Sequence, residues 1–258
     1  MTTRDTPWPD GTPCWADLGA PDLARAREFY TGVFSWIIQP GLPETGGYSV
    51  ADINGRGVAG IGPKTGPPET PTMWMTYLAT SDANVTVTRI KGAGGQIIME
   101  AMDITDVGRM AVAADPAGAV FGIWQARTFP GAQLVNEPGT MCWNEQMSSD
   151  FEASRAFYAA VFGYEYEDSS RDDLSYATVR VDGRVVGGIG GFHAGAPAAS
   201  PAAWRVYFGA ADTDAAVARV EGNGGSVILE PADHPYGRMS TVADDQGARF
   251  SLLQVTPG

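Results

Sequence analysis

The sequence has little positive charge. Of its 258 residues, 17 are Lys or Arg and 30 are Asp or Glu, so the formal net charge is −13 at pH 7. Nucleic acids and acidic membrane surfaces bind clustered basic residues, and this chain has no basic run. The composition therefore argues against both kinds of partner.

Long hydrophobic runs are also missing, and cysteine is rare. No apolar stretch approaches the roughly 20 residues that cross a bilayer, and the polar segment Met1–Pro13 lacks the apolar part of a secretion signal. The two cysteines, Cys14 and Cys142, are expected to be buried free thiols, because a cytosol keeps thiols reduced. We therefore expect a cytoplasmic protein.

The chain does contain an internal repeat. The tetrapeptide CWAD at Cys14–Asp17 returns as CWNE at Cys142–Glu145, and longer blocks follow in the same order. DLARAREFYTGVFSW, which starts at Asp22, matches DFEASRAFYAAVFGY, which starts at Asp150. DPAGAVFGIWQ near the end of the first copy matches DDQGARFSLLQ near the end of the second. We therefore expect two domains, at residues 1–130 and 131–258.

Each copy shows the same order of secondary structure. Asp22 and Asp150 are expected to cap a helix, because a carboxylate accepts the free amide hydrogens of the first turn. A hairpin follows, with its turn at Asn-Gly in the first copy and at Asp-Gly in the second. A strand, a second helix and three more strands complete each copy.

This order of motifs resembles the vicinal oxygen chelate superfamily, which includes glyoxalases, extradiol dioxygenases and bleomycin-binding proteins. The resemblance is carried by DLxxAxxFY at residues 22–30 and DPxGxxF at residues 115–121, with counterparts in the second copy. It implies an α+β fold of four βαβββ modules, paired into two cup-shaped mixed sheets.

Metal-dependent members of that family place ligands on the first, fifth and last strands of a domain. Carried over to this sequence, the three positions are Trp15, Met75 and Gly122 in the first copy, and Trp143, Arg205 and Ser251 in the second. None is a usual ligand for a divalent transition metal. The only histidines, His193 and His234, are expected at the surface. The comparison therefore implies neither a metal site nor a cofactor.

The first-strand tetrapeptides are expected to line the cups instead. Side chains alternate along a strand, so Trp15 and Asp17 share one face, as do Trp143 and Glu145. Aromatic walls with one or two charges suit a flat aromatic ligand. The alternatives are that the rings only fill the sheet core, and that Glu145 and Arg205 only neutralise each other. The predicted ligand-binding residues are Trp15, Met75, Tyr77, Trp124, Trp143, Tyr207 and Ser251.

One residue does not fit the pattern. Gln146 follows the second tetrapeptide, where the first copy has Leu18, and it should face the helix rather than the cup. A polar side chain there needs a hydrogen-bond partner. The sequence does not indicate one.

Several functions remain open. The first is metal-independent binding of a hydrophobic or aromatic small molecule, such as an antibiotic or a natural-product intermediate, in resistance or as an accessory protein of biosynthesis. The second is a lyase, isomerase, cyclase or hydroxylase-like enzyme in which Glu145 or Asp17 is the general base and Arg205 stabilises an oxyanion. The third, a metal-dependent glyoxalase or dioxygenase, lacks its ligands. We expect the site in the second copy, because Glu145 and Arg205 replace Asp17 and Met75 there, and we expect a monomer or a homodimer.

Overall fold

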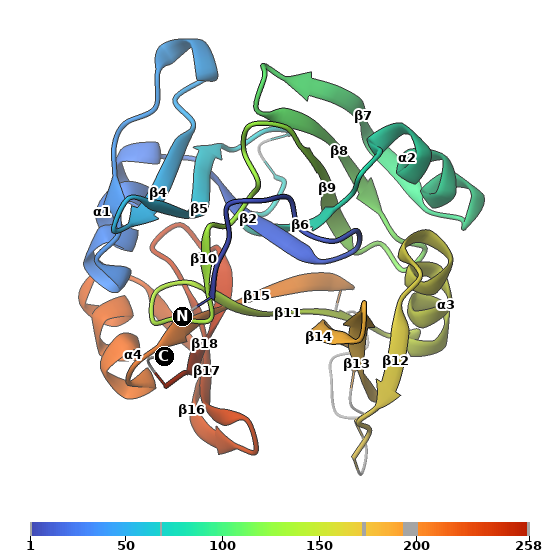
Figure 1. The fold of residues 1–258 in the computed structure, drawn as a ribbon. Coiled ribbons are helices and arrows are strands. Elements are labelled where there is room, and N and C mark those ends of the chain that lie inside the picture. Colours follow the sequence, from blue (N-terminus) through green and yellow to red (C-terminus); the bar gives the residue numbers. More distant parts are fainter. Residues whose placement is uncertain (1, 68, 172–173, 193–200, 257–258) are drawn as a thin grey trace.

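The computed structural model describes residues 2–67, 69–171, 174–192 and 201–256, and it contains two eight-stranded mixed sheets, one from each half (Figure 1). The first sheet has the strand order β3-β4-β5-β2-β6-β9-β8-β7. Its elements are β2 (Pro13–Ala20), α1 (Leu23–Phe34), β3 (Ile37–Ile38), η1 (Pro43–Thr45), β4 (Ser49–Ile53), β5 (Arg56–Pro63), β6 (Met73–Ala79), α2 (Ala83–Gly92), β7 (Gln96–Ile104), β8 (Gly108–Ala114) and β9 (Val120–Ala126).

The second sheet repeats this order as β12-β13-β14-β11-β15-β18-β17-β16. A short pair of β1 (Thr2–Thr3) with β10 (Leu134–Val135) ties the N-terminus to the segment between the sheets. The elements of the second half are β11 (Met141–Ser148), α3 (Phe151–Phe162), β12 (Glu165–Asp168), β13 (Tyr176–Val181), β14 (Arg184–Gly191), β15 (Ala203–Ala210), α4 (Thr213–Gly222), β16 (Ser226–His234), β17 (Gly237–Ala243) and β18 (Arg249–Gln254).

The modules pair within each half. The sequence did not indicate how they pair. In the first half β2 pairs antiparallel with β6, and in the second β11 pairs antiparallel with β15. Each sheet is thus made of two modules joined through their first strands. The α+β fold of four modules in two sheets is confirmed.

Local sequence explains the element boundaries. The Asp22 carboxylate accepts the amide hydrogens of Ala24 and Arg25, and Asp150 does the same for Ala153, so both expected caps are present. The first hairpin turns through Asn54 and Gly55 with φ values of 54° and 75°. These are the left-handed conformations that a two-residue Asn-Gly turn requires.

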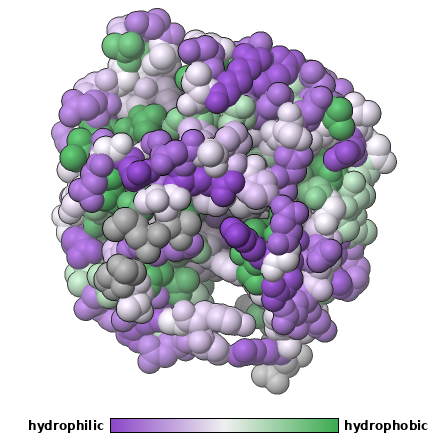
Figure 2. Space-filling model, in the orientation of Figure 1, coloured by the Kyte–Doolittle hydropathy of each residue, from purple (hydrophilic) through white to green (hydrophobic). Residues whose placement is uncertain are grey.

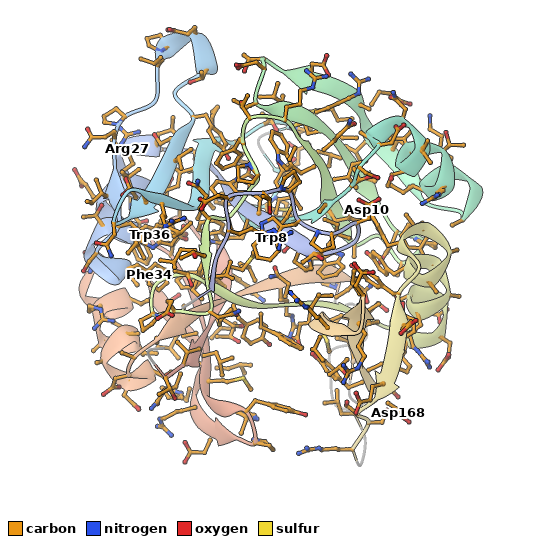
Figure 3. All side chains as sticks on the ribbon, viewed as in Figure 1. Trp8, Asp10, Arg27, Phe34, Trp36 and Asp168 are labelled. Atoms are coloured by element: carbon orange, nitrogen blue, oxygen red, sulfur yellow. The ribbon has the colours of Figure 1, made fainter. Side chains whose placement is uncertain are left out.

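The helices pack across the halves rather than within them. Helix α1 lies against α4, and α2 lies against α3 (Figure 1). Phe34 and Trp36 lie side by side at the end of α1 (Figure 3), and their rings are 5.2 and 5.4 Å from that of Phe208 in the second half. The Trp36 indole also donates to the carbonyl of Gly139 at 2.7 Å. The convex side of each sheet is therefore part of a core that both halves share.

Two buried hydrogen-bond chains cross this shared core. Trp74 Nε1 donates to the Tyr30 hydroxyl at 2.9 Å, and that hydroxyl donates to Asp244 Oδ2 of the other half at 3.0 Å. The reciprocal chain runs from Trp204 through Tyr158 to Asp115, over 2.7 and 3.1 Å. The helix tyrosine and the turn aspartate of the repeated motifs thus bond across the halves.

Gln146 belongs to the second of these chains. Its Nε2 donates to Asp115 Oδ2 at 2.9 Å and to Ser154 Oγ at 3.1 Å. Its partner is an aspartate of the other half, which explains why the local sequence gave no indication of it. The first copy has the apolar Leu18 at this position, and within the described chain Tyr30 is the only side chain that donates to Asp244.

The helices of the described residues are short. None of them combines the length and apolar character that crossing a membrane requires. The longest, α1 and α3, have 12 residues each.

Because Gln146 takes part in only one of the two hydrogen-bond chains, we predict that the same Tyr→Phe substitution lowers the free energy of unfolding by different amounts in the two halves. Tyr30→Phe leaves Asp244 Oδ2 without its side-chain donor, whereas Tyr158→Phe leaves Asp115 with Gln146. We expect Tyr30→Phe to lower the free energy of unfolding by about 2–3 kcal/mol and Tyr158→Phe by about 1–2 kcal/mol, because unsatisfied buried polar groups carry costs of this size. Urea unfolding of both variants measures this, and equal losses would contradict the account.

Candidate functional site

A chain of four side chains lies on the concave face of the first sheet. Trp15 Nε1 donates to the Tyr48 hydroxyl at 2.9 Å, and that hydroxyl donates to Asp17 Oδ2 at 3.3 Å. Tyr77 lies opposite Trp15 in the strand register, and its hydroxyl also bonds to Asp17. Two tyrosine hydroxyls therefore hold one carboxylate.

The second sheet repeats this arrangement with a glutamate. Trp143 Nε1 donates to the Tyr176 hydroxyl at 3.0 Å. Tyr176 donates to Glu145 Oε2 at 3.0 Å, and Tyr207 donates to Glu145 Oε1 at 2.7 Å. Glu145 is only 8% exposed, so its carboxylate is a fixed acceptor in a largely buried place.

Burial keeps these tyrosines in their protonated form. It raises the pKa of Tyr176 and Tyr207 well above the usual value, and the adjacent carboxylate of Glu145 raises both pKa values further. In the first sheet the same causes, with Asp17 as the carboxylate, raise the pKa of Tyr48 and Tyr77. All four hydroxyls are therefore donors to the carboxylates at neutral pH.

Strand register brings the predicted site residues together. Glu145 lies opposite Arg205, Trp143 lies opposite Tyr207, and Tyr207 is level with Ser251 on the next strand. Directly opposite residues share a face of the sheet. In the first half, Asp17 lies opposite Met75 in the same way. Ser251 itself is buried, and its hydroxyl lies 3.2 Å from that of Thr241.

Tyr48 and Tyr176, which complete the two hydrogen-bonded sets, are not among the residues predicted from the sequence. Glycines on the neighbouring strand make room for them: a Cβ at Gly60 would overlap the Tyr48 hydroxyl, and a Cβ at Gly188 would overlap that of Tyr176. The signal was present, since a tyrosine begins each predicted hairpin and alternating glycines end it. Its meaning depends on the pairing of β4 with β5 and of β13 with β14.

The first cup is covered by the chain itself. The Phe129 ring stands edge-on to Trp15, with ring centroids 4.9 Å apart and an interplanar angle of 89°. Trp124 Nε1 donates to the Phe129 carbonyl at 3.0 Å, which fixes this residue in place. The segment after it is held at the same rim, since the amide of Ala132 donates to Cys14 and that of Gln133 to Gly57. Trp15 is consequently only 5% exposed.

The second cup has no equivalent cover among the residues that the structure describes. Within that part of the chain, no aromatic ring stacks on Trp143, which is partly exposed. Leu253 takes the place of Trp124, and Arg205 is 43% exposed. The space-filling view is hollowed at its lower end, between the arms that carry β12 and β16 (Figure 2). As far as the described residues go, the two cups thus differ in access.

Two surface hollows lie away from the cups. One, of about 270 Å³, is lined by residues that include Asp10, Glu165 and Arg180, and the other, of about 280 Å³, by residues that include Phe34 and Arg219. The cations in both are already engaged, since Arg180 pairs with Glu167 and Arg219 donates to the carbonyl of Val33. The cups, in contrast, gather the aromatic and acidic side chains.

The donor set of the cups does not fit the divalent metal of the metal-dependent relatives. No three His, Cys, Asp or Glu side chains of the described chain gather in one place. Each cup has one carboxylate, and in the second both of its oxygens accept tyrosine hydroxyl hydrogens. His234 is exposed at the end of β16, and His193 lies outside the described residues.

The cysteines are free, as expected, but only Cys14 is fully buried. Cys142 is partly exposed, and its thiol contacts the carbonyl of Tyr207 at 3.5 Å. Burial nevertheless raises the pKa of Cys142 to about 12, and it raises the pKa of Cys14 further. Both therefore remain thiols at neutral pH, and neither is an activated nucleophile.

The carboxyl group of the covered cup predicts a pH-dependent stability. Burial raises the pKa of Asp17 from 3.8 to about 6, against the opposing hydrogen bonds from Tyr77 and Tyr48. A raised pKa in the folded state favours the protonated form, so this contribution is present below about pH 4 and is lost as the pH rises through about 6. Asp17→Asn should therefore gain stability relative to the natural chain over this range, by up to about 3 kcal/mol. Urea unfolding across the range measures the difference, and parallel curves would contradict it.

Comparison with known proteins places this geometry in a family. The family model described as "Glyoxalase/Bleomycin resistance protein/Dioxygenase superfamily" matches residues 15–123 and again residues 143–252. The Mn(II)-bound glyoxalase from Novosphingobium aromaticivorans superposes with a TM-score of 0.66 at 14% identity, covering 95% of this chain and 83% of that one. At this identity the superposition shows the fold alone.

Curated relatives match along nearly the whole chain. The "Putative glyoxylase CFP32" of Mycobacterium tuberculosis is 42% identical over 252 residues, which is 96% of each chain. The "Anthracycline biosynthesis protein DnrV" of Streptomyces peucetius is 36% identical over 265 residues, which is 96% of this chain and 94% of that one. The double family match, together with these relatives, shows that the chain belongs to the Glyoxalase/Bleomycin resistance protein/Dioxygenase superfamily.

Proposed function

We propose that the second cup binds a planar aromatic small molecule, without a metal ion, and that the chain acts in the handling of a natural product. One observation carries this proposal: among the residues that the structure describes, no ring stands against Trp143 as Phe129 stands against Trp15. Each cup has a tryptophan, two tyrosines and an acidic residue, Asp17 in the first and Glu145 in the second, so the covered cup indicates what the open one accommodates.

The contact of Phe129 with Trp15 models the pose of such a ligand. Edge-to-face aromatic pairs with centroids 4.5–7 Å apart contribute roughly 0.5–1.5 kcal/mol beyond the burial of their surface. The Phe129 ring is within this range of Trp15, and at 6.1 Å it is within range of Trp124 as well. A ligand ring in the equivalent place would stand edge-on to Trp143.

The polar groups of the second cup hold one another in place. Both oxygens of Glu145 already accept hydrogens from Tyr176 and Tyr207, at 3.0 and 2.7 Å. This arrangement fixes the carboxylate and the rings around it. It builds a preformed wall, which is what a ligand pocket requires.

The relatives support a natural-product ligand. DnrV and DauV, from two Streptomyces strains, are both named as anthracycline biosynthesis proteins, and each is 36% identical to this chain. Anthracyclines contain fused planar rings, which match the aromatic wall. The chain's own ligand is proposed at the level of this chemical class.

Binding of alizarin tests the proposal. Alizarin is a hydroxylated anthraquinone, and the assay is run at moderately acidic pH, where it is neutral. Isothermal titration calorimetry should show one site per chain, and chromatography should recover the alizarin unchanged. Trp143→Phe should weaken binding by about 5- to 10-fold, because a smaller ring loses roughly 1–1.4 kcal/mol of contact. The matched variant Trp15→Phe, in the covered cup, should bind as the natural chain does.

Three results would contradict the proposal. They are no binding by the natural chain, equal effects of the two substitutions, and conversion of alizarin to a product. Circular dichroism of both variants checks that each remains folded.

A further inference from the structure

Arg205, a cation at the second cup, has one long ion pair as its only side-chain partner among the described residues. Its guanidinium carries five N–H donors. The nearest anion is Glu145, with Arg205 Nη1 at 3.9 Å from Oε1, which is too long for a hydrogen bond. Among the described residues, none accepts a hydrogen bond from this guanidinium.

Glu145 does not need Arg205 as a donor. Tyr207 and Tyr176 already donate to its two oxygens, and Glu145 is largely buried while Arg205 is 43% exposed. The arginine therefore extends from the fixed acidic group toward solvent. If the two charges only neutralised each other, the donors of Arg205 would be left to solvent.

A ligand on Trp143 would cover this cation. Tyr207, the register partner of Trp143, is two residues from Arg205 on the same strand, so both side chains share the concave face. A ligand without an acceptor would remove water from the guanidinium and leave it with one long ion pair. Burying a charge in that way is unfavourable unless a new partner compensates.

We infer that the aromatic ligand of the second cup carries an anionic group, a carboxylate or an ionised phenol, and that Arg205 binds it. This inference rests on the proposed function. Arginine presents a planar fork of donors that matches a carboxylate in two parallel hydrogen bonds. The first cup, which Phe129 covers, has the uncharged Met75 at this position.

The mouth of the second cup adds a second cation. Arg171, which follows β12, lies over the ring of Tyr236, in the turn between β16 and β17, at 5.8 Å. Strands β12 and β16 are the two opposite edges of this sheet, so the contact spans the opening. These two arginines bring positive charge to the opening, beside acidic residues of β12 such as Glu167 and Asp168.

A matched pair of probes tests the inference. Anthraquinone-2-carboxylate and anthraquinone-2-carboxamide share their ring system and a carbonyl acceptor, and they differ in charge. Calorimetry at low ionic strength and neutral pH should show the carboxylate binding the natural chain at least about 10-fold more tightly, a difference of about 1.4 kcal/mol. Arg205→Met, which installs the residue of the first cup, should remove this preference while still binding the carboxamide.

The controls separate charge from geometry and from folding. Arg205→Lys should keep part of the preference, because it keeps the charge but loses the planar fork. Retained carboxamide binding shows that each variant is folded. Equal affinities of the natural chain for the two probes, or an undiminished preference in Arg205→Met, would overturn the inference and leave the proposed function standing. If neither probe binds the natural chain, the proposed function fails, and this inference fails with it.

Discussion

The reciprocal tyrosine–aspartate pair between the halves is the constraint on which the architecture depends. Tyr30 bonds to Asp244 and Tyr158 bonds to Asp115, each in a buried place where an unpaired group would be costly. Each pair joins a helix of one half to a turn of the other. The convex faces of the two sheets are thereby packed together, and the concave faces are left to form two separate cups.

The duplicated halves place the same kind of hydrogen-bonded side chains in both cups, but among the described residues only the first cup is covered. In both, a tryptophan, two tyrosines and one carboxylate form a single hydrogen-bonded wall. In the first cup, the segment that joins the halves supplies Phe129 as a cover. The first cup is therefore part of the protein's core, and the second is proposed as the site that meets a ligand.

The fold could be predicted from the sequence because its signals are local and repeated. Asp22, Asp150 and the Asn54-Gly55 turn each determine their own segment, and the repeat shows that the pattern is not accidental. Alternation along a strand predicted that the site residues share one face of the sheet. In the strand register, Glu145 lies opposite Arg205 on that face.

What the sequence could not show depends on contacts between distant segments. Tyr176 meets Glu145 only because β13 pairs with β14, and Gln146 meets Asp115 only because the halves pack against each other. Phe129 lies in a Pro- and Gly-rich link, where no periodicity indicates its place over Trp15. Local sequence patterns therefore predict which residues line a cup. Whether the cup is open to solvent depends on tertiary contacts.

A crystal structure of the chain with anthraquinone-2-carboxylate tests the central claim most directly. The account predicts one ligand per chain, in the second cup, with its ring edge-on to Trp143 and its carboxylate on Arg205, while Phe129 remains against Trp15. A ligand in the first cup would contradict it. A ligand bound elsewhere on the protein, with Trp143 left uncovered, would contradict it as well.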